Sequence, residues 1–360
     1  MNLRIPGPVP LPDEVLELVG SQMIDHRGPE FAVMLDRMTR NLKAILATAA
    51  DAFFLTSSGT GAMEAGVVNT LSPGDRVLSI SIGVFGDRYG LIAEAYGAEV
   101  TRLKYALGQA ADPDDVRRIL RDAPGCAAVV LTHSESSTGV ANPLEAIARA
   151  VHDESDALIL VDAVSSAAAI PIATDAWGID VVATAAQKAW VAPPGIAMIS
   201  FSDRAWKAYE AAKMPRFYFD VAQYRQYLQI GQPPFTPCLP AIYALDHSMQ
   251  AIVDEGIEAA FARHHERAEQ ARDGVAALGL ELLPERSVAS DTVTAVKVPQ
   301  GIDGRELVRR VREEHGVVLG GGQQALAGRI FRIGHMGWVE RHHIDGALRA
   351  VAKTLAAMRS

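Results

Sequence analysis

Between residues 53 and 201 the chain alternates short apolar runs with longer amphipathic stretches. The runs rich in apolar and β-branched residues predict seven strands, at Phe53–Thr56, Arg76–Ile82, Glu99–Leu103, Ala127–Thr132, Ala157–Asp162, Asp180–Thr184 and Ile196–Phe201. Helical patterns separate most of them, at Gly61–Asn69, Asp114–Arg121, Pro143–His152 and Arg204–Ala211. Near-continuous apolar strands that alternate with helices predict an α/β fold with a mainly parallel seven-stranded sheet, covered by helices on both faces.

The pattern differs on either side of this region. Residues 1–30 are rich in Pro and Gly and predict an extended arm. A helix from Glu30 to Thr48 follows. After residue 240, one long helical region (241–278) leads into a strand at 291–298, a helix at 304–315, a strand at 329–334 and a closing helix, and the glycines at 320–322 predict a flexible turn. We therefore predict an arm (1–30), a large domain (31–240) and a smaller α+β domain (241–360).

Composition narrows the classes of function. The formal charge of −9 and the lack of a basic stripe argue against nucleic acid as a partner. The N-terminus has no apolar signal region, and the most apolar stretch, 157–173, is interrupted by Asp162 and Pro171, so we predict neither secretion nor a membrane span. Two cysteines imply no disulfide framework. The neighbouring histidines 264–265 and 342–343 lack metal-ligand spacing, so we predict no metal site. Because we expect no signal peptide, no membrane span and no disulfide framework, we predict a cytoplasmic enzyme.

Lys188 follows the sixth predicted strand, Asp180–Thr184, and precedes Pro193-Pro194-Gly195. Burying an ammonium group without a partner is costly, so a lysine here either reaches water or performs chemistry. A desolvated lysine loses its proton readily and becomes a nucleophile toward carbonyl groups. An isolated lysine at a strand end more often extends to solvent, so a chemical role for Lys188 depends on the other residues around the proposed site.

A glycine-rich turn connects the first strand to its helix, in Thr56-Ser57-Ser58-Gly59-Thr60-Gly61-Ala62-Met63-Glu64. Such a turn presents backbone N–H groups and a helix N-terminus to an anion. It is not a dinucleotide fingerprint, because Glu64 stands where the third glycine would be, and it lacks the lysine of a P-loop. A plain helix cap remains the alternative.

Three further side chains stand in or next to predicted strands. Asp162 closes an apolar strand, at the edge where open α/β sheets bind ligands, although Asp also caps helices. Phe85 follows another strand end and could stack on a ring, or belong to the core. Arg332 lies inside an apolar strand and suits a carboxylate partner, or a structural ion pair. A phosphate cradle, a stacking ring, a carboxylate for a ring nitrogen, a nucleophilic lysine and a carboxylate-binding arginine together form a site for transamination with pyridoxal 5'-phosphate.

With these motifs the sequence resembles the class V aminotransferases, fold-type-I pyridoxal-phosphate enzymes, and among them the alanine/serine–glyoxylate branch. The resemblance runs nearly from end to end, through Pro6-Gly7-Pro8, His26-Arg27-Gly28-Pro29-Glu30-Phe31, Ser58-Gly59-Thr60-Gly61-Ala62-Met63-Glu64, His133-Ser134-Glu135-Ser136-Ser137-Thr138-Gly139-Val140, Val161-Asp162-Ala163-Val164-Ser165-Ser166, Gln187-Lys188, Pro193-Pro194-Gly195, Thr236-Pro237 and Arg332-Ile333-Gly334-His335-Met336-Gly337.

The resemblance implies a role for each matching residue. Lys188 would form the internal aldimine and then move the α-proton of the substrate, and Asp162 would pair with the pyridine nitrogen. The other cofactor contacts implied are the phosphate ligands Ser58, Gly59 and Thr60, the ring neighbours Phe85 and Val164, and Ser136 and Gln187 near the phenolic oxygen. Arg332 would bind the substrate carboxylate, with the backbone of Gly7 and Pro8 lining the same pocket.

The resemblance also implies a homodimer with shared active sites, because Thr236 of a neighbouring subunit would complete the phosphate site. Members of the family often place a tyrosine three residues before that threonine. Here Pro233 stands at that position, and either Gln232 or Tyr227 substitutes or the contact is missing.

We therefore expect an aminotransferase that moves an amino group from a small amino acid, alanine or serine first, to glyoxylate or another 2-oxo acid in a ping-pong cycle. Aspartate or ureidoglycine as donor remains an alternative. A cysteine desulfurase or lyase of the same superfamily is a second one, against which stand Phe85, where desulfurases place a histidine, and the lack of a mobile-loop cysteine. A non-catalytic cofactor-binding protein is a third, against which stand Lys188 and Arg332.

Overall fold

The seven predicted strands form one sheet in the computed structural model, which describes residues 1–359. Its order is β2-β10-β9-β8-β5-β3-β4. The strand bounds are Asp51–Ser57 (β2), Arg76–Ser81 (β3), Glu99–Lys104 (β4), Ala128–Thr132 (β5), Leu158–Asp162 (β8), Val181–Ala185 (β9) and Gly195–Phe201 (β10). All neighbours are parallel except β10, which is antiparallel to both β2 and β9. The predicted α/β fold with a mainly parallel sheet is confirmed.

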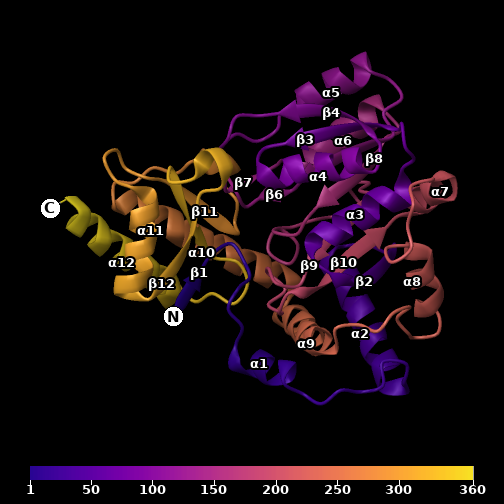
Figure 1. Cartoon of the computed structure of the whole chain (residues 1–360), viewed down its shortest axis with the longest axis horizontal. Helices are drawn as coiled ribbons and strands as arrows, with labels where there is room; N and C mark the ends of the chain where they lie inside the picture. The colour runs from indigo at the N-terminus through magenta and orange to yellow at the C-terminus, as the bar shows by residue number, and fades with distance from the viewer. Residues whose placement is uncertain (360) are drawn as a thin grey trace.

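Helices cover both faces of this sheet (Figure 1). On one face lie α3 (Gly59–Thr70), α4 (Val84–Ala95), α7 (Asp203–Ala211) and α8 (Val221–Leu228). On the other lie α2 (Pro29–Ile45), α5 (Pro113–Asp122), α6 (Leu144–Glu154) and α9 (Leu239–Glu255). Successive residues of a strand point to opposite faces of the sheet. Val130 belongs to the core beneath α3 and α4, and Leu131 belongs to the core beneath α5 and α6. This double burial explains why the inner strands β5, β8 and β9 are buried at every residue, whereas the edge strand β4 has exposed residues.

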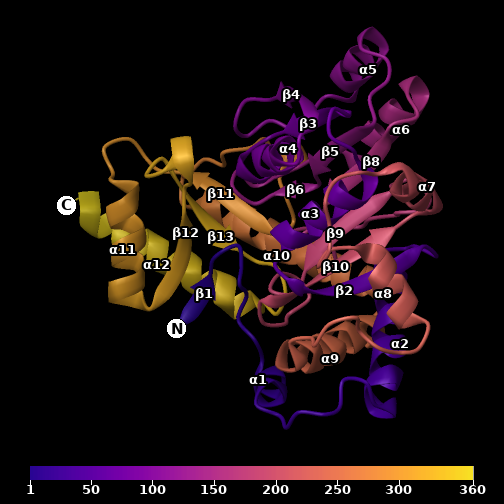
Figure 2. The same cartoon turned by 45° about the vertical axis from the view of Figure 1, so that its right-hand side comes forward.

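A second, four-stranded sheet forms the smaller lobe, at the left of Figures 1 and 2. Its order is β1-β12-β13-β11, with bounds Asn2–Arg4, Val317–Gly321, Ile330–Gly334 and Val293–Lys297. It packs against α10 (Ile257–Ala277), α11 (Gly304–His315) and α12 (Arg341–Arg359). A short hairpin, β6 (Ser134–Glu135) with β7 (Val140–Ala141), projects from the large sheet toward this lobe. Two 3₁₀ turns, Arg286–Val288 and Gln324–Leu326, complete the described elements.

Several local expectations need correction. The arm is not extended throughout, because it holds helix α1 (Asp13–Val19) and strand β1, which pairs with β12 of the small sheet. The long helical region is interrupted at Gly256, whose φ of 93° ends α9 and begins α10. The predicted flexible turn at 320–322 is wrong for its first two residues, since Gly320 and Gly321 belong to β12 and pair with β13. Helices α4 and α8 were not expected.

The carboxyl ends of β5, β8 and β9 meet at one edge of the large sheet, beside the hairpin and the small lobe. Ligands of open parallel sheets bind at this edge. Among residues 1–359 no helix is both long and apolar enough to cross a membrane.

Candidate active site

Lys188 lies in the turn that follows β9, three residues beyond the last strand residue Ala185. Its side chain is buried, with 9% of its surface exposed, and its Nζ donates a hydrogen bond to the carbonyl oxygen of Pro6. Gly7 packs directly on it, since a Cβ at that position would stand 2.7 Å from Lys188 Cδ. Burial lowers the pKa of Lys188 to about 8, although the nearby charge of Asp162 raises it. A lysine in this state supplies a neutral, nucleophilic amine at nearly physiological pH.

Asp162 ends β8, as the sequence predicted, and is 3% exposed. Its Oδ1 accepts a hydrogen bond of 2.9 Å from the backbone N of Val164, and its Oδ2 accepts one of 3.2 Å from Thr132 Oγ1. Burial raises the pKa of Asp162 to about 6, and the charge of Glu135 raises it further. A buried carboxylate of this kind gains from a cationic partner, which is what a protonated pyridine nitrogen offers.

The turn between β2 and α3 forms the expected cradle. Ser58 is the N-cap of α3 and its side chain caps no backbone group, so the first N–H groups of the helix are available to a ligand. At Gly59 a Cβ would stand 2.4 Å from Val164 Cγ2, so only glycine lets Val164 approach the cradle. Thr60 is half-buried beside it and accepts a hydrogen bond of 3.2 Å from Arg88 Nη1. The cradle, Val164 and Asp162 thus follow one another along one side of the site.

Phe85 lies in the first turn of α4, and its backbone is bound by Glu135, a residue to which the sequence analysis assigned no role. Glu135, fully buried, accepts hydrogen bonds at Oε2 from the backbone N of Phe85 (2.9 Å) and of Gly86 (3.0 Å). Its Oε1 accepts from the N (3.1 Å) and Oγ (2.6 Å) of Ser137. A carboxylate at a helix N-terminus satisfies its free N–H groups. The sequence feature that could have indicated Glu135 is its position as an acidic residue in a polar segment directly after the buried strand β5.

Arg332 lies within β13, 6% exposed, and reaches from the small lobe to the large domain. Its Nε and Nη2 donate to the carbonyl oxygen of Gly321 at 3.0 and 2.6 Å, and its Nη1 donates to that of Ser136 at 2.7 Å. These bonds use three of the five guanidinium hydrogens and leave one on each terminal nitrogen for a carboxylate. Burial lowers the pKa of Arg332 to about 10, which leaves it charged at neutral pH.

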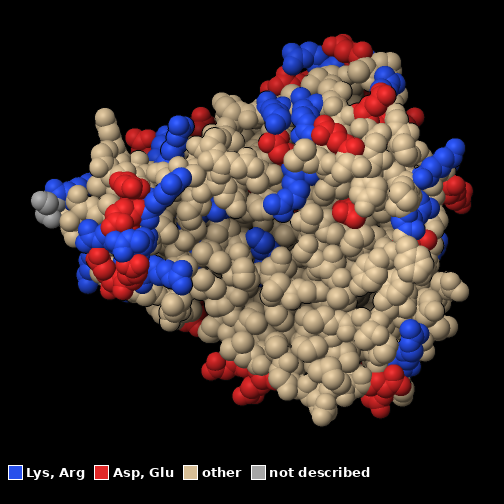
Figure 3. All heavy atoms as spheres, in the orientation of Figure 1, with Lys and Arg blue, Asp and Glu red and all other residues tan. Residues whose placement is uncertain are grey.

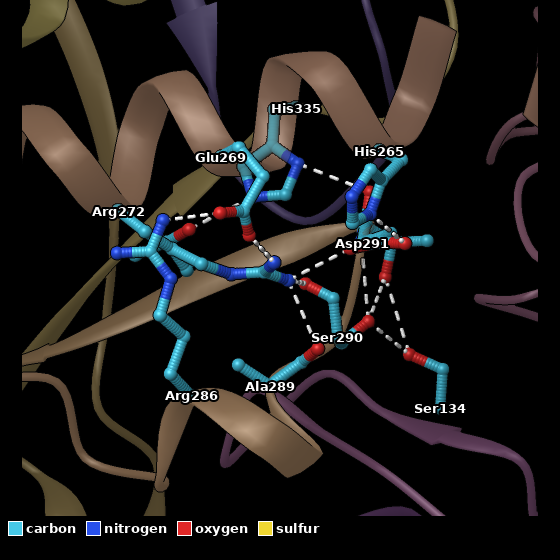
Figure 4. A network of polar contacts seen from close by, with 11 residues as sticks. Ser134, His265, Glu269, Arg272, Arg286, Ala289, Ser290, Asp291 and His335 are labelled. Carbon is cyan, nitrogen blue, oxygen red and sulfur yellow. Dashed lines mark hydrogen bonds and ion pairs between the residues drawn. The ribbon is translucent and has the colours of Figure 1, made fainter. Parts of the chain in front are cut away.

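A polar network supports β13 from behind (Figure 4). The imidazole of His335 is hydrogen-bonded to Thr294 Oγ1 and to the carbonyl oxygen of Asp291. Arg272, 3% exposed, pairs with Asp291 and Glu269, and the hydroxyls of Ser134, Ser290 and Thr292 join the β6 hairpin to the small lobe. His264 is part of the same scaffold, because its Nε2 accepts a hydrogen bond from the N of Gly337. No three His, Cys, Asp or Glu side chains of the described chain are placed to hold a metal ion.

Among residues 1–359, the predicted cross-dimer residues form no hydrogen bond with the side chains of this centre. Thr236 is exposed, in the loop before α9, and makes no hydrogen bond through its side chain among the described residues. Gln232 is engaged within its own chain, since its amide exchanges hydrogen bonds with the guanidinium and carbonyl of Arg27. Arg27 also lies over the ring of Tyr227, 5.6 Å from its centroid.

The residues present fit pyridoxal phosphate. The chain offers a lysine of lowered pKa, a carboxylate of raised pKa and a glycine-containing cradle at the start of α3, where no side chain caps the helix. The side-chain oxygen of Gln187, next to Lys188, is buried and has no hydrogen-bond partner, which leaves it for a ligand group. The charges of Asp162, Arg332 and Glu135 all influence Lys188, so the sequence-predicted residues share one electrostatic environment.

Comparison with known proteins agrees with this geometry. The family model described as "Aminotransferase class-V" matches residues 16–350. The small subunit of a soluble hydrogenase from Synechococcus sp. (strain PCC 6716) is 42% identical, over 99% of this chain and 93% of that protein. An L-aspartate–glyoxylate aminotransferase from Paracoccus denitrificans is 37% identical, over 92% of this chain and 85% of its own. The crystal structure of an alanine–glyoxylate aminotransferase from Nostoc sp. superposes with a TM-score of 0.94 at 30% identity, over 98% of this chain and 94% of that one.

Proposed function

The chain belongs to the class-V aminotransferases, pyridoxal-phosphate-dependent enzymes that transfer amino groups, and from this we propose that it moves the amino group of a small amino acid, alanine or serine first, to glyoxylate or a similar 2-oxo acid. One observation carries the proposal: a buried lysine of lowered pKa lies in the same electrostatic environment as a buried carboxylate and a half-satisfied arginine.

Each side chain then has a distinct task. Arg332 binds and orients the carboxylate of the amino acid with its two remaining N–H groups. When bound, pyridoxal phosphate supplies an electron-withdrawing ring that spreads the charge left by the departing α-proton. Lys188 accepts that proton at Nζ and later returns it, a role suited to an amine whose pKa is about 8. Asp162 holds a positive charge at the far end of the site, and the burial of all three groups excludes water.

The charges near Arg332 support the proposal of a small, neutral amino donor. Arg332, on β13, supplies one cation to the site. A small neutral donor has one carboxylate for this cation, whereas a dicarboxylic donor has a second carboxylate that needs another. The relative from Paracoccus is named for aspartate, so aspartate is the alternative donor to compare. A half-reaction screen decides: purified holoenzyme is mixed with each amino acid and the loss of visible absorbance is followed. Rapid bleaching by alanine or serine supports the proposal, and bleaching by aspartate alone contradicts the choice of donor.

We further propose a homodimer whose active sites are shared, with Thr236 of one subunit near the phosphate cradle of the other. The exposure of Thr236, together with exposed apolar side chains nearby at Phe217 (73%) and Ile230 (62%), supports an interface on this face. Mixing the Lys188→Ala and Thr236→Val variants tests it. A shared site restores one wild-type centre in the mixed dimer, so activity exceeds that of either parent, whereas separate sites give only the sum.

The two cysteines of the chain do not favour the alternative of a cysteine desulfurase. A desulfurase needs a reactive cysteine. Cys126 donates a hydrogen bond to the carbonyl oxygen of Ala128, and burial raises the pKa of its thiol. Cys238 lies beside Gly195, with its backbone N bonded to Thr56. Both thiols are free, which supports a cytoplasmic location. The similarity to a hydrogenase subunit does not alter the proposal, which rests on the lysine, carboxylate and arginine present.

A further inference from the structure

Arg88 touches two parts of the candidate active site. It lies on α4, three residues after Phe85, and its guanidinium carbon stands 4.8 Å from the centroid of the Phe85 ring. Its Nη1 donates a hydrogen bond of 3.2 Å to Thr60 Oγ1 in the cradle. Both partners are neutral, so neither balances the charge of the arginine.

No carboxylate of residues 1–359 forms an ion pair with Arg88, although the side chain is half-buried. The acid next to it, Asp87, is engaged by Lys104 at 2.8 Å and by Arg102 at 4.0 Å. Arg225 makes a useful comparison. It lies over the Trp206 ring at 4.4 Å, and it also pairs with Asp51 at 3.0 Å. Arg88 has the same contact with an aromatic ring but no anion.

The position of Arg88 makes this lack of an anion informative. Through Thr60 the guanidinium stands at the N-terminus of α3, whose first turn carries no acidic residue. A full positive charge and the positive end of a helix dipole therefore converge on the cradle. Two such groups repel each other unless an anion lies between or beside them, and a phosphate dianion accepts hydrogen bonds from both.

We propose that Arg88 is a ligand of the cofactor phosphate and, through its contact with Phe85, also fixes the stacking ring. The proposal rests on the proposed active site and adds a cationic residue that the motifs of the cradle did not indicate. Arg88 thereby couples recognition of the phosphate to the placement of Phe85, so that a phosphate-bearing ring orders both ends of the site.

The test compares the affinity of the apoenzyme for pyridoxal phosphate and for pyridoxal, which lacks the phosphate, by absorbance titration. Arg88→Ala and Arg88→Gln are compared with wild type, and Arg225→Ala serves as the matched control. We expect both Arg88 variants to weaken pyridoxal phosphate binding by about 10- to 100-fold, as for loss of a charge-assisted hydrogen bond, and pyridoxal binding by less than about threefold. Arg225→Ala should leave both affinities unchanged.

Equal losses for the two ligands would overturn the proposal, because they would show that Arg88 acts only through Phe85. Unchanged affinity for pyridoxal phosphate would overturn it as well. Arg88→Gln keeps a hydrogen-bond donor to Thr60 and gives the answer if Arg88→Ala does not fold. Failure of the wild-type protein to bind pyridoxal phosphate would instead contradict the proposed function, so the two failures are distinguishable.

Discussion

Arg332 Nη1 lies 2.7 Å from the carbonyl oxygen of Ser136, which ties the small lobe to the large domain at the centre of the site. The residue before it, Glu135, fixes the backbone of Phe85. One short turn therefore positions both Arg332, which we propose binds the substrate carboxylate, and Phe85, which we propose stacks on the cofactor. Disturbance of this turn is expected to affect substrate and cofactor together, whereas disturbance of Arg332 alone is expected to affect the substrate.

Replacing Arg332 by Ala should raise the KM for the amino donor on the order of 100-fold or more, because a buried bidentate charge pair is lost. The dissociation constant for pyridoxal phosphate should change little. Arg332→Lys keeps the charge but not the fork of two N–H groups, so it should recover only part of the loss. Steady-state kinetics and cofactor titration measure the two effects, and equal damage to both would contradict the carboxylate role.

Replacing Glu135 by Gln should weaken cofactor binding and raise the amino-acid KM, each by about 10-fold, since an amide turns an N–H donor toward backbone N–H groups. The control is Ser137→Ala, which removes the 2.6 Å hydroxyl contact to Glu135 and the 3.1 Å bond from the backbone N of Val84 to that hydroxyl, and leaves the bonds of Glu135 to Phe85 and Gly86 intact. A variant that loses thermal stability but keeps both affinities would show that Glu135 supports the fold alone.

The large sheet was predictable because double burial leaves its mark on every strand residue, as in Ala128–Thr132. Helix α4 was not predictable in the same way. Its Gly86 and Gly90 resemble turn residues, yet they are required by packing, since a Cβ at Gly86 would stand 2.8 Å from Ser81 Cα. The strand at Gly320 was hidden for a similar reason: the glycine admits Pro6, whose Cδ would lie 2.9 Å from a Cβ there.

Among the site residues, Lys188, Asp162 and Arg332 were recognisable because a charged group in apolar surroundings is conspicuous in a sequence. Glu135 stands among polar neighbours, and Arg88 directly follows an acidic residue, so neither charge is conspicuous in the sequence. Their roles depend on contacts with distant segments. Glu135 bonds to the backbone 50 residues earlier in the chain, and Arg88 to a threonine 28 residues earlier. Such long-range partners leave no local pattern.

Asp162→Asn should change how the stability of the apoenzyme depends on pH. Because the pKa of Asp162 is raised to about 6, its protonated form stabilises the fold fully below pH 4, and this contribution is lost as pH rises through 6. The variant has no such loss. Its free energy of unfolding, relative to wild type, should therefore rise between pH 4 and 7 by up to about 3 kcal/mol. Denaturant titrations at several pH values measure this, and a constant difference would contradict the raised pKa. The same variant should lose most of its turnover.

Lys188 of the apoenzyme should react with cyanate at lower pH than ordinary lysines. Its lowered pKa of about 8 means that the neutral amine forms as pH rises through 8, whereas an ordinary lysine side chain requires about 10.4. Peptide mass spectrometry after brief carbamoylation at pH 6–10 gives the profile, and the exposed Lys207 provides the internal reference in the same digest. A profile for Lys188 that coincides with that of Lys207 would show that the burial does not shift its proton equilibrium.

We propose that the amine of Lys188 carries the cofactor. Borohydride reduction of the holoenzyme, followed by proteolysis and mass spectrometry, tests it most directly. We expect a phosphopyridoxyl group on the peptide that contains Lys188, and neither visible absorbance nor turnover in a folded Lys188→Ala variant. Attachment to another lysine, or full activity of that variant, would contradict it.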